Sequence, residues 1–181
     1  MVVAPLSLPG LVLAGWIGWT LAEYLLHRVD MHGLGGRGTT SREHLDHHAG
    51  DPLVPRRSPT TWAGAVIVGL GLGWAGDPAL SAGWVAGYAA YDLRHWSIHA
   101  RPPRTRRQRR AWRHHLHHHF ARPDANYGVT SAVWDVVFRS RVRPDRVPVP
   151  RAMAMPWLLD DDGRVRPGFA ADYEVVDGPA W

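Results

Sequence analysis

The sequence predicts an all-α protein: an integral membrane helical domain of about three short membrane helices, topped by a cytosolic, histidine-rich cap. Three apolar runs support the helices, at residues 6–22, 62–76 and 79–91. The histidines support the cap, because their four clusters lie outside these runs. The arginines support the orientation, since residues 91–151 hold fourteen arginines against four acidic residues.

The three apolar runs are short for membrane helices. They contain 17, 15 and 13 residues, whereas a full span needs about 20 apolar residues. Tryptophans such as Trp16 and Trp19 are typical of membrane helices, and less apolar flanks such as residues 23–26 would complete the spans. Run length leaves one alternative open, a set of buried core helices in a soluble α protein.

The order of the runs predicts that all the clustered histidines lie on one side of a membrane. The first helix delivers His27 to that side, and Asp77-Pro78 forms a turn between the second and third helices. The third helix returns to the same side with His95. The segment 101–113 holds seven arginines, so the positive-inside rule makes this side cytoplasmic, and a bacterial plasma membrane is expected. The N-terminus lacks the basic region of a cleaved signal peptide.

Two regions are predicted along the chain. Residues 1–143 form the membrane domain, and residues 144–181 form an irregular, Pro-rich, acidic C-terminal tail. From residue 152 onward two arginines stand against six acidic residues, with little periodicity. No regular element is therefore expected in the tail.

Composition limits the chemistry of any site in this chain. The absence of cysteine excludes disulfides, thiolate metal ligands and thiol nucleophiles. Histidine, in contrast, is abundant, with twelve in 181 residues. A metal site must therefore be built from histidine and carboxylate side chains.

The spacing of the histidines predicts such a site. Residues three or four apart share one face of a helix, and His44, His47 and His48 have this spacing. The five-residue step from His27 to His32 would serve if the helix loosens or ends near Asp30. Neutral imidazole binds zinc, iron and copper, and ten imidazoles are enough for two ions. The candidate ligands are His27, His32, His44, His47, His48, His95, His99, His115, His118 and His119.

The fourth histidine cluster allows two registers. His115, His118 and His119 share a helix face, but His114, His117 and His118 have the same spacing one residue earlier. Spacing alone does not choose between these sets. A low-complexity tract that binds metals loosely would explain this cluster, but not the same pattern in the second cluster.

Few carboxylates lie near the clusters. A carboxylate that accepts a hydrogen bond from a ligand histidine fixes its tautomer, and Asp46 and Asp92 are placed to do this. Each is equally consistent with a solvated acid. Glu23 and Asp135 are the other nearby acids. Soluble di-iron bundles use glutamate ligands, so the pattern indicates a different design.

Together the four clusters resemble the histidine boxes of the fatty acid hydroxylase/sterol desaturase superfamily, a group of membrane di-metal oxygenases. The resemblance covers about residues 20–140. Phe120 after the paired histidines favours the register of His115, and the stretch from Gly128 to Phe138 is similar to one in fatty acid hydroxylases. The boxes are Glu23-x-x-x-His27-Arg-x-x-x-His32, His44-x-x-His47-His48, Tyr91-x-x-x-His95-x-x-x-His99 and His115-x-x-His118-His119-Phe120.

The resemblance implies a dioxygen-dependent lipid hydroxylase. It implies two iron ions held by the ten histidines, with zinc possible in the isolated protein and dioxygen as co-substrate. The di-metal centre itself would be the catalytic element, with no separate catalytic side chain. A membrane lipid, with a fatty acyl chain favoured, is the implied substrate, and a separate electron-transfer protein is the implied partner.

Several alternatives share some of these features. A sterol or lipid desaturase or a carotenoid hydroxylase would use the same kind of site. A divalent-metal transporter is disfavoured, because its ligands would lie near the bilayer midplane rather than at helix ends. The arginines of residues 104–110 raise nucleic-acid binding, but beside a membrane such runs more often contact anionic headgroups, so no nucleic acid is expected as partner.

Overall fold

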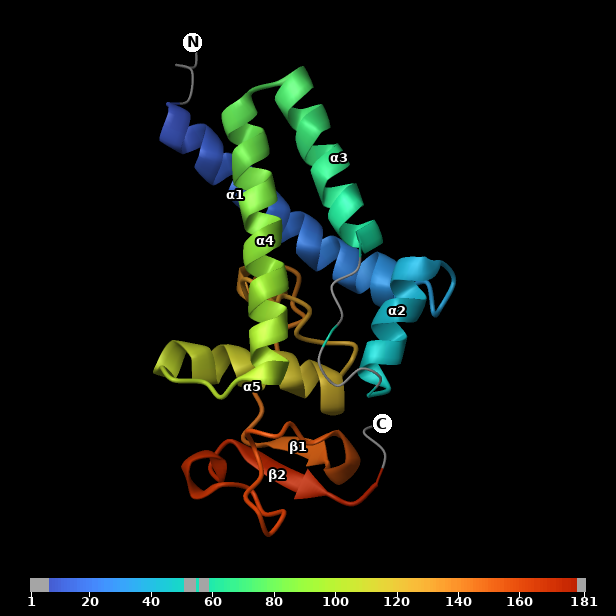
Figure 1. Ribbon diagram of the computed structural model, residues 1–181, viewed down its shortest axis with the longest axis vertical. Coiled ribbons are helices and arrows are strands. Elements are labelled where there is room, and N and C mark those ends of the chain that lie inside the picture. Colours follow the sequence, from blue (N-terminus) through green and yellow to red (C-terminus); the bar gives the residue numbers. More distant parts are fainter. Residues whose placement is uncertain (1–6, 51–54, 56–58, 179–181) are drawn as a thin grey trace.

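The chain is mostly helical, with one small parallel sheet near the C-terminus (Figure 1). The computed structural model describes residues 7–50, 55 and 59–178. The helices are α1 (Leu8–Leu25), the π-helix η1 (Leu26–His32), α2 (Thr39–His48), α3 (Pro59–Ala75), α4 (Pro78–Ala100), α5 (Arg106–Phe120) and α6 (Val133–Val137). The C-terminal elements are β1 (Val147–Pro150), the 3-10 turns η2 (Arg151–Met153) and η3 (Pro167–Phe169), and β2 (Tyr173–Val176).

Helices α1 and α4 cross with their backbones in close contact, and glycine makes this crossing possible. A methyl group on Gly15 would lie 2.1 Å from the carbonyl oxygen of Leu80, and one on Gly83 would lie 2.0 Å from that of Val12. Any side chain at either position would therefore force the helices apart. This close crossing fixes the direction in which α4 carries its histidines toward the lower half of the molecule (Figure 1).

Helix α4 runs back along α3 after a tight turn, as the sequence predicts. Asp77 caps α4 by accepting a hydrogen bond from the Ala79 backbone N–H at 2.7 Å, and Pro78 occupies the first helical position. Trp84 of α4 donates its indole N–H to the Ala65 carbonyl of α3 at 3.1 Å. The second and third apolar runs thus form a helical hairpin.

The prediction of an integral membrane domain with about three short membrane helices is wrong. In the part of the chain that the structure describes, no helix is both long enough and apolar enough to cross a membrane. Helices α1 and α3 have 18 and 17 residues, and α1 includes the buried Glu23. Helix α4 has 23 residues, but its last part carries Asp92, Arg94 and two histidines. Apolar runs in sequence therefore did not become uniformly apolar helices of spanning length.

The all-α prediction is also wrong, because the C-terminal segment contains a sheet that was not expected. Strands β1 and β2 pair in parallel, with Val147 opposite Tyr173 and Pro150 opposite Val176. Prolines are compatible with these strands because a two-stranded sheet has only edge strands, where a missing N–H leaves no ladder bond unmade. The domain boundary placed at residue 143 stays a prediction.

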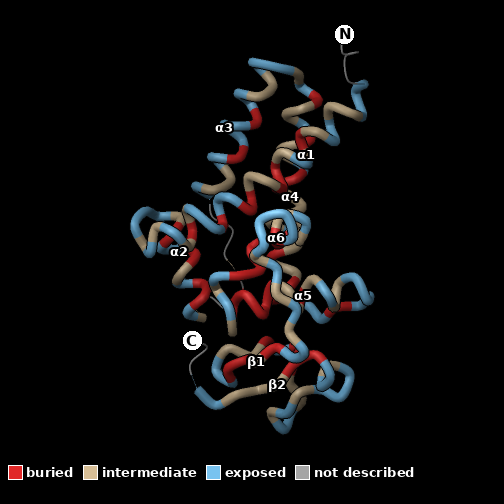
Figure 2. Tube along the Cα trace, turned by 180° about the vertical axis from the view of Figure 1, so that it is seen from behind, coloured by how far each residue is buried: buried red, intermediate tan, exposed pale blue. Residues whose placement is uncertain are grey.

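The sheet and the end of α4 sandwich α5 in the main apolar core. Figure 2 shows that buried positions concentrate around α5 and β1, whereas α3 has long exposed stretches. Asp172, just before β2, forms ion pairs with Arg109 at 2.6 Å and Arg113 at 3.2 Å of α5. The core side chains are Ile98, Trp112, Leu116, Phe120, Val129, Val147, Val149, Met155, Trp157, Leu158 and Tyr173. Packing in this core fixes the position of α5 relative to α4.

Candidate metal centre

Four helices bring the ten candidate histidines together at the centre of the molecule. Three pairs or triplets lie at α-helical spacing on α2, α4 and α5. His27 and His32 lie on η1, whose π-helical turn has about one more residue than an α-helical turn. The π-helix is the kind of loosening under which His27 and His32 could share a face, and it places residues five apart on one face.

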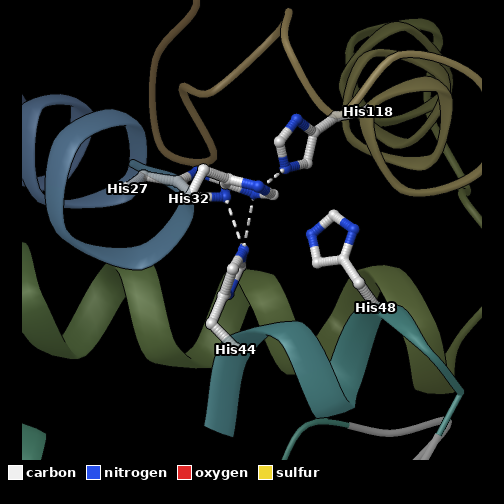
Figure 3. A group of neighbouring side chains, drawn as sticks. All are labelled: His27, His32, His44, His48 and His118. Carbon is white, nitrogen blue, oxygen red and sulfur yellow. Dashed lines mark hydrogen bonds between the residues drawn. The ribbon is translucent and has the colours of Figure 1, made fainter. Parts of the chain in front are cut away.

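One group of imidazoles combines His27, His32, His44, His48 and His118, whose ligand atoms all lie within 4.8 Å of one another (Figure 3). The Nε2 atom of His44 lies 3.0 Å from that of His27 and 2.9 Å from that of His32. The Nε2 atoms of His32 and His118 lie 3.0 Å apart. The nitrogens of three helices thus converge on one small volume.

Backbone carbonyls fix which nitrogen of two of these rings faces that volume. His27 Nδ1 lies 2.5 Å from the Tyr127 carbonyl oxygen, and His118 Nδ1 lies 2.7 Å from that of Ala125. A carbonyl oxygen only accepts, so each Nδ1 carries the proton and each neutral ring presents its Nε2 lone pair to its neighbours. Lone pairs that converge in this way fit a bound cation, and this is the arrangement found around metal-ligating histidines.

A second group combines His47, His95, His99 and His119, again with ligand atoms within 4.8 Å of one another. His115 adjoins this group, with its Nε2 3.3 Å from that of His99. The His95 Nε2 and His115 Nδ1 atoms are buried and have no hydrogen-bond partner among the described residues. An unsatisfied buried nitrogen is costly in an empty protein interior, whereas a metal ion would satisfy it.

The two groups adjoin each other. The rings of His48, in the first group, and His119, in the second, stack with their centroids 3.9 Å apart. The two groups are therefore in direct contact. Ser41 fixes α2 against η1, since its hydroxyl donates to the Met31 carbonyl at 2.7 Å and accepts from the Gly36 N–H at 2.9 Å. The arrangement therefore offers two adjoining sets of ligand atoms, each of which could hold a cation.

Burial keeps these imidazoles neutral. It lowers the pKa of His27 to about 3 and that of His32 to about 4. Burial and the neighbouring histidines also hold six further pKa values well below the ordinary value of 6.5, those of His44, His48, His95, His115, His118 and His119. Because a metal competes with the proton for the same lone pair, a neutral cluster is ready to bind metal at neutral pH.

The two registers of the fourth cluster differ in what they contact. His115, His118 and His119 turn toward the convergent groups. His114 instead places its Nε2 3.0 Å from an Asp135 oxygen, and His117 Nδ1 accepts from the Asn126 amide at 3.3 Å. Geometry thus separates the two sets that spacing could not, and the metal-binding role of the ten histidines stays a prediction.

Two carboxylates support the centre in a way that the sequence did not reveal. Glu23 accepts from the Val129 and Thr130 N–H groups at 2.6 and 2.8 Å, and burial raises its pKa to about 7. Asp135 accepts from the N–H groups of Tyr127 and Gly128 at 2.8 and 2.9 Å. Both therefore hold the segment 125–130, whose carbonyls bind His27 and His118.

The two carboxylates that the sequence suggested as partners of ligand histidines, Asp46 and Asp92, are not the ones that hold the segment 125–130. Asp46 is exposed on α2, and Asp92 is half-buried on α4. Glu23 lies 106 residues from Val129 in sequence, so no local spacing could link them. The available signals were the first histidine box, which begins with Glu23, and the stretch from Gly128 to Phe138, which contains Asp135.

Comparisons with known proteins agree with this geometry. The family model "Fatty acid hydroxylase" matches residues 12–140. Dihydroceramide fatty acyl 2-hydroxylase FAH2 of Arabidopsis thaliana is 32% identical over 144 residues, which cover 71% of this chain and 60% of that protein. The fatty acid 2-hydroxylase of Homo sapiens is 29% identical over 154 residues, which cover 77% of this chain and 41% of that protein.

A solved structure resembles the chain as well. The hydroxylase domain visible in full-length scs7p superposes with a TM-score of 0.60 and 28% sequence identity, over 75% of this chain and 56% of that one. The chain spans about 60% of the length of FAH2, the plant relative. The family match covers most of the chain, including all four histidine clusters. The chain therefore belongs to the fatty acid hydroxylase family.

Proposed function

We propose that the chain is a dioxygen-dependent lipid hydroxylase that acts on a fatty acyl chain through a pair of histidine-bound metal ions. One observation carries the proposal: ten histidines, nearly all of them buried, converge in two adjoining groups. A cysteine-free, all-imidazole donor set fits iron and also accepts zinc. The names of the relatives, which are fatty acid and dihydroceramide fatty acyl hydroxylases, agree with this chemistry.

The protein's own residues prepare and protect the site in this proposal. His27, His32, His44, His48 and His118 would hold one ion, and the other five histidines would hold the second. The carbonyls of Ala125 and Tyr127 keep two of the rings in the tautomer that binds metal. Burial of the groups excludes water, which protects a reactive centre from side reactions.

Iron, when bound, supplies the activation of dioxygen. Overall, one oxygen atom enters a C–H bond to give an alcohol, and the other leaves as water. Two electrons and two protons complete this balance, and a separate electron-transfer protein would deliver the electrons. The residues of this chain would therefore need only to bind metal, orient the lipid and exclude water.

Exposed apolar side chains support lipid as the substrate class. Leu8, Leu13 and Ile17 of α1 are about half to two-thirds exposed, and in α3 Ile67 is about two-thirds exposed and Trp74 almost fully exposed. Extensive exposed apolar surface marks contact with a partner or with lipid. We include in the proposal that these faces contact lipid. The cytoplasmic orientation predicted from the sequence depended on spanning helices, and none is found among the described residues.

Isotope labelling tests the proposal. The purified, iron-loaded protein is incubated with a reductant, an electron donor, labelled dioxygen and a mixture of fatty acids and dihydroceramide. The expected product is a hydroxylated acyl chain with one labelled oxygen atom. A product two hydrogens lighter and without label would mean desaturation, and label taken up from water would reject the oxygenase.

A further inference from the structure

A strongly basic cavity lies beside the N-terminal half of α5, apart from the histidine groups. Its volume is about 540 Å³, which exceeds the size of a single ion. Three separate segments contribute arginines to its wall, and no carboxylate side chain lines it. The arginines are Arg94 of α4, Arg107, Arg110 and Arg113 of α5, and Arg141 and Arg143 of the segment after α6.

Most of this positive charge has no ion-pair partner among the described residues. Arg113 forms an ion pair with Asp172, but the other five arginines of the cavity make no ion pair in the described part of the chain. The nearest lining histidine, His114, already binds Asp135. Like charges gathered from three segments repel one another, so the empty cavity is electrostatically unfavourable. An anion would remove this repulsion.

One arginine in the wall is incompletely bonded. Arg94 is half-buried, and its Nε is buried without a hydrogen-bond partner among the described residues. A guanidinium donates readily to the oxygens of a phosphate or carboxylate, and several guanidiniums around one cavity favour phosphate with its larger charge. The wall is therefore built for an oxyanion of the phosphate class.

One side of the cavity is apolar, and it is continuous in sequence with the exposed apolar helix α6. Val129, Ala132 and Val142 line it, and α6 begins directly after Ala132. The outward residues of α6, Val133 and its neighbours at 136 and 137, are more than half exposed. Helix α6 in turn packs on α1, where the Trp134 indole donates to Thr20 at 3.0 Å. A ligand with a charged head and an apolar tail matches this surface.

We propose that this cavity binds the phosphate headgroup of an anionic lipid, whose acyl chain lies along α6. The cavity is separate from the histidine groups, because none of the six arginines belongs to them. The occupant can be a substrate or a lipid that holds the protein at a surface. In both roles the same guanidinium groups bind the same phosphate.

Two double variants with equal changes in charge test the cavity. Arg107→Gln with Arg110→Gln removes two cavity arginines from α5. Arg104→Gln with Arg106→Gln removes two exposed arginines from the same basic segment but outside the cavity, and serves as the control. None of these four side chains makes an ion pair in the described structure. Thermal unfolding monitored by circular dichroism should give similar Tm values for both variants.

Calorimetric titration then measures the Kd for dihexanoyl phosphatidylglycerol, dihexanoyl phosphatidylcholine and inorganic phosphate. The anionic lipid should bind most tightly, and the cavity variant should weaken it about tenfold or more, since each lost charge-assisted bond contributes to affinity. The control variant should weaken it less than about threefold, as expected for exposed, solvent-screened charges outside the cavity.

Three outcomes would overturn the proposal. Equal losses in the two double variants would show a general charge effect rather than binding in the cavity. Equal affinity for phosphatidylcholine would remove the role of net negative charge. Inorganic phosphate binding as tightly as phosphatidylglycerol would identify a free ion, not a lipid headgroup, as the occupant.

Discussion

The two halves of α5 show how burial decides the charge of a basic helix. The first half, residues 106–113, carries five arginines, most of them exposed or lining the basic cavity. The second half, residues 114–119, carries five histidines, four of them buried. The arginines keep their charge under all conditions, whereas burial holds the imidazoles of His115, His118 and His119 neutral. One helix thus presents cations at its start and neutral candidate metal ligands at its end.

The largest expected effect separates neighbouring histidines within the second half. His118→Ala removes an imidazole whose Nε2 lies in the first histidine group, so hydroxylation should fall by more than about a thousandfold. His117→Ala removes an imidazole that contacts Asn126 instead, so activity should fall less than about threefold. Product formation by mass spectrometry measures both.

One outcome for these two alanine variants would contradict the prediction. If the two alanine variants lost activity equally while keeping the same Tm, the contacts of α5 would not distinguish ligands from bystanders. The register chosen for the fourth cluster would then be wrong.

The next effect concerns Asp135, which connects His114 to the segment 125–130. Asp135→Ala leaves the N–H groups of Tyr127 and Gly128 buried without their acceptor, so the free energy of unfolding should fall by about 4 kcal/mol. Asp124→Ala is the control, because that exposed acid bonds only to the surface Arg122 and its loss should change stability little. Urea denaturation measures both. Equal changes would mean that Asp135 is not a structural anchor.

A smaller, pH-dependent effect tests whether burial also sets ionisation beside the histidine groups. The buried Glu23 has its pKa raised from 4.5 to about 7, so folding favours its protonated form. That stabilisation is complete below about pH 4.5 and is lost as the pH rises through 7. The Glu23→Gln variant cannot ionise at this position. As the pH rises from 4.5 to 7.5, the free energy of unfolding of the wild type should therefore fall relative to that of the variant by up to about 3 kcal/mol.

Urea denaturation of both proteins across this pH window gives the difference directly, because the histidines titrate alike in both. Parallel stability curves would show that Glu23 ionises at its ordinary pKa. The buried environment assigned to the centre would then be wrong at this position.

The sequence predicted the candidate site better than the architecture around it. Histidine spacing is local, so i, i+3 and i, i+4 pairs on α2, α4 and α5 could be assigned to common faces before the fold was known. The five-residue step from His27 to His32 also had a local explanation in a loosened helix, which η1 provides. Phe120 correctly drew attention to the register that faces the convergent groups.

The rest depended on long-range contacts. Glu23 and Asp135 act on the segment 125–130, and nothing in their neighbouring residues indicates those partners. The apolar runs indicated helices but not their final lengths or polar ends, so membrane spans were predicted where none is found among the described residues. The Pro-rich segment at 147–150 concealed a strand because its pairing partner lies 26 residues further along the chain.

Metal content tests the central claim most directly. Elemental analysis of the purified, iron-loaded wild type should give about two iron or zinc ions per chain. His118→Ala and His119→Ala alter different groups, so each should lose about one ion, while His117→Ala should keep both. A folded wild-type protein that hydroxylates lipid without bound metal, or one that binds equal metal in all three variants, would contradict the account.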